Sequence, residues 1–408
     1  MLRILRFAAN NVTANKKRTL LTIAVIIIGL CSINIGKGIM SGMQKESELS
    51  VTEGRTGEIQ IHKQGYFDSS ELNILNYSIN NASRLQDELK RIEGVEDVAG
   101  RIQFGGLLAK GDETAVVVFC RAADIANEVK VCPKIKDNII EGRFLTEDDA
   151  NGAVIAEGLQ KGIGANLGDF IIVVANTKDG FQNAVELEIV GIIKEKAAQA
   201  NTRLVYLSME KAQELLYMGD EVTEIVMKTS ENSNVDVLNQ RLNHLLKNRG
   251  LESNTWVDVS AFFVGVMEKQ NVVVFALCLI FYCIVISSIT NTMVLTLFER
   301  QKEIGTMMAI GIKSGHVIRL IIMESTIIGF IGSLMGILLS ALVIVVLNRI
   351  GLSYKPPAGA DLVTIYPLIN PSFMFLSFVL GVLSAIVGSI YPARKVLQVN
   401  PIDALRTV

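Results

Sequence analysis

The sequence lacks the motifs that common enzyme classes require. Its three histidines, His62, His244 and His316, fall in separate regions, so their spacing fits no metal site. There is no G-x-x-x-x-G-K-[S/T] phosphate loop, which excludes ATP binding of that kind. No G-x-S-x-G elbow or paired acid motif appears either. We therefore expect no catalytic residue, no metal and no cofactor bound by this chain.

A strong excess of one charge is also missing. The 39 Lys and Arg residues nearly balance 41 Asp and Glu residues, giving a net charge of −2, so nothing indicates a nucleic-acid partner.

The chain contains five cysteines. Cys31, Cys278 and Cys283 lie in apolar runs, where they serve as small apolar fillers. Cys120 and Cys132 lie in the long middle of the chain, between the first two apolar runs, where a disulfide and two free buried thiols both remain open.

What the sequence does contain is long apolar runs. They cover residues 20–40, 272–298, 317–347 and 372–391, and each reaches the roughly 20 residues needed to cross a bilayer. Lys and Arg cluster before the first run, between the second and third, and after the fourth. By the positive-inside rule, both termini and the link between the second and third runs are cytoplasmic. The long middle of the chain then lies outside.

These observations predict an α-helical membrane protein with four transmembrane helices and a large mixed α/β extracytoplasmic domain between helices 1 and 2. Two strand–helix–strand patterns, near residues 57–109 and 222–257, suggest a split α/β sheet around a β-rich insertion near 122–220. The predicted segments are an amphipathic helix 1–18, transmembrane helix 19–43, outer domain 44–268, transmembrane helix 269–298, cytoplasmic link 299–316, transmembrane helix 317–349, outer loop 350–371, transmembrane helix 372–392 and cytoplasmic tail 393–408.

The cytoplasmic link has the pattern of a short amphipathic helix. Apolar or small residues recur at i, i+3, i+4 and i+7, namely Ile304, Met307, Met308 and Gly311. Gly311 suits the position just past the helix end. Periodicity alone is equally compatible with a surface helix that merely connects two spans.

The residues of this link carry a resemblance. The run Glu299-Arg300-x-x-Glu303-Ile304-Gly305, followed by Ala309-x-Gly311, resembles ABC transporter permeases of the superfamily of macrolide exporters, lipoprotein-releasing permeases and cell-division permeases. Residues 391–394 and 400–406 resemble that superfamily's C-terminal ending, although Val396 replaces a usual Ala. Residues 57–66 and 141–145 resemble the lipoprotein-releasing branch most.

The resemblance implies a permease subunit of the bacterial inner membrane. Its coupling helix would dock on a separate ABC-type ATPase that binds ATP and Mg, and a second permease chain, identical or paralogous, would complete the complex. The implied activity is release of lipoproteins by ATP-driven motion. Macrolide or peptide efflux with a periplasmic adaptor and control of cell-wall hydrolases are the alternatives. The residues expected to couple to the ATPase are Glu299, Arg300, Lys302, Glu303, Ile304, Gly305, Ala309 and Gly311.

Two hypotheses concern the spans themselves. Glu324 is a carboxylate inside the third run, and we expect an ion pair with Arg300, Lys302 or Arg319. Small residues at Gly329, Gly332 and Gly336 predict close helix packing. The outer ends of spans one and two carry flexible or broad apolar side chains that would suit an acyl chain, although ordinary packing explains them equally well. These candidate cavity residues are Met40, Met43, Phe262, Phe263 and Met267.

Overall fold

The structure is a computed structural model that describes residues 16–67, 74–111, 115–195, 198–230, 233–354 and 363–395. The chain divides into two compact units, one formed by residues 1–46 and 265–408 and the other by residues 47–264. We call them the membrane unit and the outer unit. Most of the expected amphipathic helix 1–18 and of the tail 393–408 lies outside the described residues.

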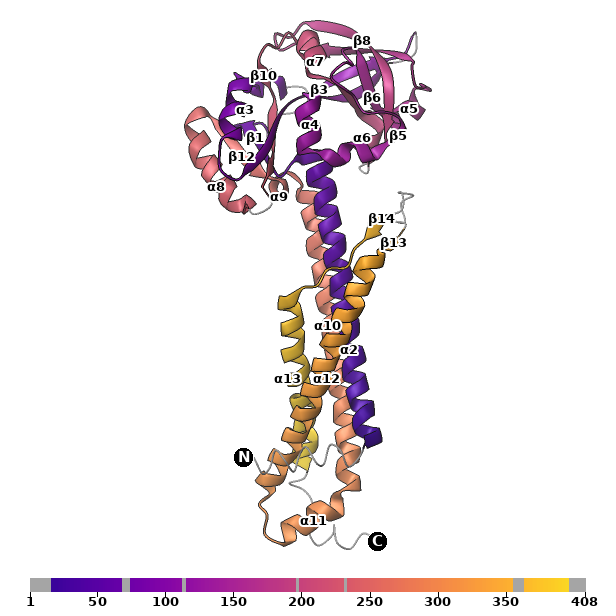
Figure 1. Ribbon diagram of the computed structural model, residues 1–408, viewed down its shortest axis with the longest axis vertical. Helices are drawn as coiled ribbons and strands as arrows, with labels where there is room; N and C mark the ends of the chain where they lie inside the picture. The colour runs from indigo at the N-terminus through magenta and orange to yellow at the C-terminus, as the bar shows by residue number, and fades with distance from the viewer. Residues whose placement is uncertain are drawn as a thin grey trace. The chain divides into compact units, whose positions relative to one another are not determined.

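Within the described ranges, four helices are long and apolar enough to cross a membrane (Figure 1). They are α2 (Lys16–Val51), α10 (Ala261–Glu299), α12 (Ser314–Ile350) and α13 (Pro371–Lys395). Between α10 and α12 lies the short α11 (Gln301–Ala309), and a two-stranded sheet of β13 (Leu352–Tyr354) and β14 (Val363–Ile365) follows α12. The predicted fold class, four apolar helices with a mixed α/β domain after the first, is confirmed.

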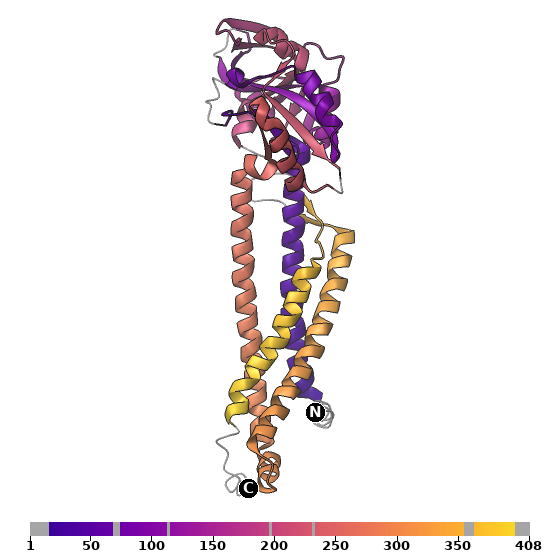
Figure 2. The ribbon, with the colours of Figure 1, turned by 90° about the vertical axis from the view of Figure 1, so that its left-hand side faces the viewer.

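Small residues bring the membrane helices close together. In both views α12 and α13 run side by side (Figure 1 and Figure 2). A Cβ added at Gly329 of α12 would lie 2.5 Å from the Cβ of Ala385 on α13, and one at Gly332 would lie 3.0 Å from the Cβ of Ile26 on α2. Gly336 similarly approaches Leu30 at 3.1 Å. The expected small-residue packing of Gly329, Gly332 and Gly336 is therefore present.

In the outer unit, two strand–helix–strand units interleave in one antiparallel sheet. The first unit is β1 (Ile59–Lys63), α3 (Ala82–Lys90) and β3 (Val95–Ala109), and the second is β11 (Glu224–Thr229), α8 (Val235–Leu246) and β12 (Leu251–Thr255). The strand order is β12-β1-β11-β3, so each unit contributes a central strand. This is the split α/β arrangement that the sequence predicts.

The insertion closes into a barrel, which the sequence does not predict. Strand β3 is 15 residues long, and its second half leaves the split sheet to pair with β4 and β7. Pairing then continues from β4 to β9, β6, β8 and β7, and β7 returns to β3. At this seam a Cβ on Gly106 would lie 2.9 Å from the carbonyl oxygen of Val174, so glycine permits the close approach. The other barrel strands are β4 (Val116–Ala123), β6 (Gly152–Ala156), β7 (Phe170–Asn176), β8 (Gln182–Ile193) and β9 (Leu204–Ser208).

Short elements complete the outer unit. Strand β5 pairs with β8 at one edge of the sheet, and β2 pairs with β10 as a separate ribbon. These elements are α4 (Ile125–Val131), β5 (Ile139–Gly142), α5 (Glu157–Gly162), α6 (Ala198–Arg203), α7 (Met209–Leu216), β2 (Ile79–Asn80), β10 (Glu221–Val222) and α9 (Trp256–Val259).

The two outer cysteines are free, buried thiols. Cys120 packs in the main hydrophobic core, and Cys132 belongs to a separate small cluster with Ala99, Val131 and Val226. Burial raises the pKa of the Cys132 thiol to about 11, although the charge of Arg101 opposes this shift. The sequence leaves open a disulfide or two free thiols, and in the structure Cys120 and Cys132 are free thiols.

The glycine seam between α12 and α13 gives a stability prediction. We expect Gly329→Ala to destabilise the permease by about 1–3 kcal/mol, because the new methyl group would overlap Ala385 in a packed interface. Gly315→Ala in the same helix is the matched control, because nothing lies within 4 Å of its Cβ position. Thermal unfolding in detergent measures both. Equal melting temperatures for the two variants would contradict close packing at this seam.

Candidate functional site

The cytoplasmic link folds as a separate short helix, α11. Helix α10 ends at Glu299, and α11 begins after a single residue, Arg300. Gly311 has a φ of +94°, and its N–H donates to the carbonyl of Met308 at 3.1 Å while the N–H of Ile312 donates to that of Met307 at 3.1 Å. These two bonds form a Schellman motif, which ends a helix with glycine in the left-handed conformation. The predicted role of Gly311 as the helix stop is confirmed.

The periodic apolar face of α11 points into the membrane unit. Ile304 is buried against Val317 and Ile321 of α12 and Ala393 of α13. Met307 and Met308 are half-buried and pack on the same cluster. Gly305 is buried as well. The amphipathic pattern therefore packs α11 against its own unit, and the opposite face is exposed.

Arg300, the residue between α10 and α11, forms ion pairs that stabilise this junction. Its Nε donates to Glu303 Oε2 at 2.9 Å, and its Nη1 lies 3.5 Å from Glu324 Oε2 on α12. Glu324 is only 8% exposed, so this ion pair supplies charge compensation that a buried carboxylate requires. Among the three cations that the sequence leaves open for Glu324, Arg300 is the one in contact. It faces inward and is only partly exposed.

The outward face of the link consists of the remaining expected coupling residues and two isoleucines. Ile310 is 78% exposed and Ile312 is 41% exposed, next to the Schellman turn. Sequence reasoning did not select these two because neither falls on the Ile304 stripe. They are the large apolar side chains among the exposed residues of the link, which are otherwise charged, polar or small. The expected coupling residues that share this exposure are Glu299, Lys302, Glu303, Ala309 and Gly311.

The candidate cavity residues are only partly described. Met40 and Met43 on α2 and Met267 on α10 are half-buried, whereas the side chains of Phe262 and Phe263 lie outside the described residues. The two helices are joined here, because Asn271 Oδ1 on α10 accepts hydrogen bonds from Gln44 Nε2 at 3.2 Å and Lys37 Nζ at 3.4 Å on α2. These polar contacts bracket Met40 and Met43 along α2.

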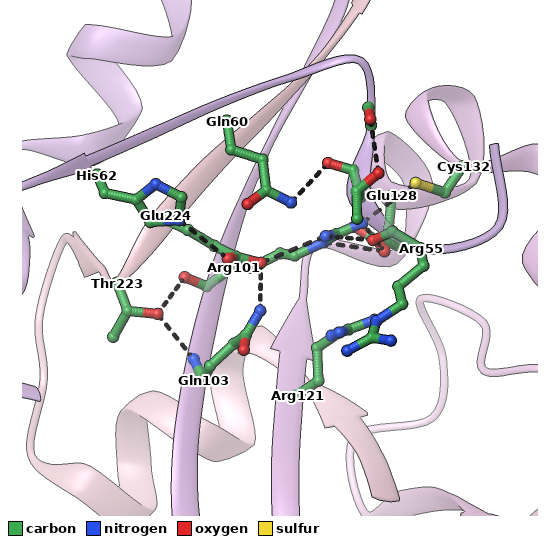
Figure 3. Close-up of polar contacts among 12 residues, drawn as sticks. Arg55, Gln60, His62, Arg101, Gln103, Arg121, Glu128, Cys132, Thr223 and Glu224 are labelled. Atoms are coloured by element: carbon green, nitrogen blue, oxygen red, sulfur yellow. Dashed lines mark hydrogen bonds and ion pairs between the residues drawn. The ribbon is translucent and has the colours of Figure 1, made fainter. Parts of the chain in front are cut away.

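A second polar site lies in the outer unit, where α2 ends. The helix passes into a π-helical turn, Thr52–Thr56, and Gly57 with a φ of +66° then redirects the chain into β1. Such a turn leaves backbone carbonyls without helical partners. Arg101 Nη1 donates to the carbonyl of Arg55 at 2.7 Å, and Gln60 Nε2 donates to that of Thr56 at 2.8 Å (Figure 3). Side chains of the sheet therefore complete the turn.

Arg101 is the centre of this site and is 1% exposed. Its Nε and Nη2 form a bidentate pair with Glu128 of α4 at 2.8 and 2.7 Å. Nη2 also donates to Cys132 Sγ at 3.2 Å, and Nη1 lies 3.3 Å from Glu224 Oε1. Burial lowers the pKa of Arg101, but Glu128, Cys132 and Glu224 outweigh it and leave the pKa raised. The guanidinium is therefore a permanent buried cation.

Glu224 links Arg101 to the first strand of the sheet. Its carboxylate accepts a hydrogen bond from Gln103 Nε2 at 2.5 Å, and His62 Nε2 lies 3.4 Å away (Figure 3). Burial alone would raise the pKa of Glu224. The hydrogen bond from His62 and the charge of Arg101 outweigh this effect and hold the pKa well below its usual range. The acid is thus ionised at neutral pH. We call Arg101, Glu128, Glu224, His62 and Gln103 the buried network.

No sequence pattern indicated the buried network. Its members come from β1, β3, α4 and β11, so no local spacing connects them. The only hint available was the presence of charged residues within strand patterns, as at Arg101 and Glu224. Two other charged residues of the outer unit make ion pairs at its turns, since Arg143 pairs with Asp149 and Asp169 Oδ2 lies 2.8 Å from Lys110 Nζ.

Comparisons with known proteins cover both units. Residues 19–245 match the family of the MacB-like periplasmic core domain, and residues 274–401 match the FtsX-like permease C-terminal family. The macrolide export ATP-binding/permease protein MacB of Mannheimia succiniciproducens is 22% identical over 99% of this chain and 61% of its own length. The chain thus spans about three fifths of that relative.

Two further relatives match over almost their whole length. An uncharacterized ABC transporter permease of Methanocaldococcus jannaschii is 24% identical over 99% of this chain and 97% of its own length. The lipoprotein-releasing system transmembrane protein LolC of Neisseria meningitidis serogroup B is 20% identical over 95% of this chain and 94% of its own.

The buried network gives a second stability prediction. We expect Arg101→Met to cost about 3–5 kcal/mol, because it leaves Glu128 and Glu224 as buried charges without their cation. Hydrogen exchange at residues 52–57 should rise, since the turn loses a donor. The double variant Arg101→Met/Glu128→Leu should recover part of the loss, and Arg84→Gln on the exposed face of α3 is the control. If residues 52–57 exchange as in the unaltered protein, Arg101 does not hold the turn.

Proposed function

Since the chain belongs to the ABC transporter permeases with a MacB-like periplasmic core and an FtsX-like C-terminal region, we propose that it transmits ATP-driven motion from an ABC-type ATPase to its outer unit. The observation that carries this proposal is the two-sided build of α11. One face of α11 is packed on α12 and α13, and the turn that follows α11 leaves Ile310 and Ile312 exposed. A helix held on one side can receive a push from the other.

The ATPase would bind ATP and Mg and would meet the outward face of the link in the cytoplasm. Its contact would centre on Ile310, with Lys302 and Glu303 at the polar margin, because interfaces combine an apolar centre with a charged rim. Arg300 and Ile304 would transmit the push to α12 through Glu324 and Ile321. In this proposal, Arg300 stabilises the break between α10 and α11 through Glu303 and Glu324, and its neighbours make the contact with the ATPase.

Helix α2 is a long, continuous element that could carry motion to the outer unit. It is continuous over 36 residues, a length of about 54 Å, which exceeds the thickness of a bilayer core. Within the membrane unit, Ile26 and Leu30 pack with Ile328 of α12 and Val285 of α10. At its other end, the turn after Val51 is fixed by the buried network. We propose that motion of α12 displaces α2 and, with it, the outer unit.

For the cargo we propose lipoproteins, released from a bacterial inner membrane in which both termini face the cytoplasm and two permease chains assemble. The similarity to LolC over nearly the full length supports this choice. A lipid-anchored cargo needs an apolar surface, because exposing acyl chains to water costs about 0.8 kcal/mol per CH₂. Met40, Met43 and Met267 would offer such a surface beside Asn271.

Macrolide or peptide efflux with a periplasmic adaptor is the second candidate. Several relatives that match most of this chain carry the name macrolide export protein, among them those of Mannheimia succiniciproducens and Campylobacter jejuni. The two candidates share the coupling step and differ in what reaches the outer ends of α2 and α10. An experiment at Met43 can therefore separate them.

The coupling proposal predicts that two substitutions in the link differ in their effect on stability. Ile310→Ser should leave stability within about 0.5 kcal/mol, because the side chain is exposed, yet should abolish coupling to the ATPase. Arg300→Gln should lower stability by about 3 kcal/mol, because Glu324 loses its partner. Melting temperature and ATPase-driven transport measure the two effects. Ile350→Ser, at an equally exposed isoleucine at the far end of α12, is the control. Full transport by the Ile310→Ser variant would refute the contact.

The cargo proposal predicts specific cross-links. A photo-reactive methionine analogue at Met43 or Met267 should give adducts to mature lipoproteins, and these should disappear when the lipid anchor is removed. The same analogue at Met335, exposed on α12, is the matched control for general contact with the membrane. Adducts to an adaptor protein with none to lipoproteins would favour efflux instead.

A further inference from the structure

Next to the buried network lies a second guanidinium that is buried but incompletely bonded. Arg121 on β4 is 4% exposed. Its Nη1 donates to the hydroxyl of Tyr206 at 3.2 Å, and its Cζ lies 5.6 Å from the centroid of the Tyr206 ring. Its Nε is buried without a hydrogen-bond partner, and no carboxylate among the described residues comes within ion-pair distance of this side chain. Arg121 therefore differs from Arg101, whose cationic charge is fully compensated.

Arg55, the neighbour of Arg121, is also without a counter-ion. Its backbone carbonyl belongs to the π-helical turn and binds Arg101, but its side chain runs away from the turn toward the Arg121 guanidinium (Figure 3). In the part of the chain that the structure describes, this side chain makes no hydrogen bond or ion pair. It is exposed to solvent. Desolvation, and next the charge of Arg121, lower the pKa of Arg55.

Two guanidinium groups thus point toward each other (Figure 3), and the acid beside Tyr206 is already engaged. Glu195 accepts a hydrogen bond from the Tyr206 hydroxyl at 3.4 Å. Like charges that approach each other are unfavourable unless water or an opposite charge compensates them. Arg55 is exposed, so an anion from solution has access to the pair and would supply a direct opposite charge.

We propose that Arg55 and Arg121 form a binding site for a phosphate-bearing anion. Guanidinium groups present planar forks that bind the oxygens of phosphate in bidentate fashion, and one phosphate has enough oxygens for two such forks. Arg55 belongs to the turn that ends α2, and Arg121 belongs to barrel strand β4. A bound phosphate group joins these two elements within the outer unit. Inorganic phosphate and a phospholipid headgroup share the required chemistry.

The test is phosphate binding by the full chain, which depends on neither the ATPase nor the cargo. Purified permease in detergent is titrated with inorganic phosphate, with chloride at matched ionic strength as the reference, and the shift in melting temperature is recorded. Phosphate should raise the melting temperature more than chloride does. Arg55→Gln should weaken the apparent phosphate affinity about tenfold, since it removes a charged hydrogen-bonding fork. Arg84→Gln, an exposed arginine on α3, should bind as the unaltered protein does.

Two further arms complete the experiment. Arg121→Lys keeps the buried charge but removes the fork, so we expect reduced phosphate affinity with a folded protein. In nanodiscs, native mass spectrometry compares retention of phosphatidylglycerol by the unaltered protein and by Arg55→Gln. Preferential loss from Arg55→Gln assigns the site to a lipid headgroup, and equal retention with a phosphate effect in detergent assigns it to a soluble phosphate. An equal response to phosphate and chloride, or an unchanged response in Arg55→Gln, overturns the proposal.

Discussion

The bidentate pair between Arg101 and Glu128 is the interaction on which the outer unit most depends. A helix that ends inside a folded domain exposes carbonyl groups that need donors, and three residues of this turn, Thr52, Gly54 and Thr56, are buried. Arg101 supplies a donor to the Arg55 carbonyl only because Glu128 and Glu224 compensate its charge. Removing any one of these partners leaves a buried charge or an unpaired carbonyl, so the three elements α4, β11 and the turn are held together as a set.

Hydrophobic patterning predicted the parts of the structure that depend on local sequence. The four apolar helices, the interleaved strand–helix–strand units and the glycine faces at Gly329 and Gly336 all follow from runs, alternation and spacing. Gly311 was predictable for the same reason, because a left-handed residue after an amphipathic segment strongly favours glycine. Each of these features depends only on residues that are close together in the sequence.

The remaining features depend on contacts between distant segments. Barrel closure joins residues 107–109 to residues 172–174, and no single strand pattern reveals which strand returns to β3. For the same reason the sequence did not show which charges pair within the buried network. For α11, the resemblance pointed to the cytoplasmic link, but it could not show which residues of the link are buried and which are exposed. Arg300 turned inward because Glu324, 24 residues away, needs a cation.

Arg300 and Arg101 each stabilise a point where a long helix ends. Arg300 follows the end of α10, and Arg101 binds the turn that ends α2. A long helix is stiff along its axis, but it can transmit displacement only if its ends do not unwind or slip. A cation whose charge is compensated within a packed site resists both movements, since separation would leave charges unpaired away from water. Arg55 and Arg121 lie beside the second break without such compensation. A bound anion would complete there, from outside the chain, what Glu128 and Glu224 provide from within it.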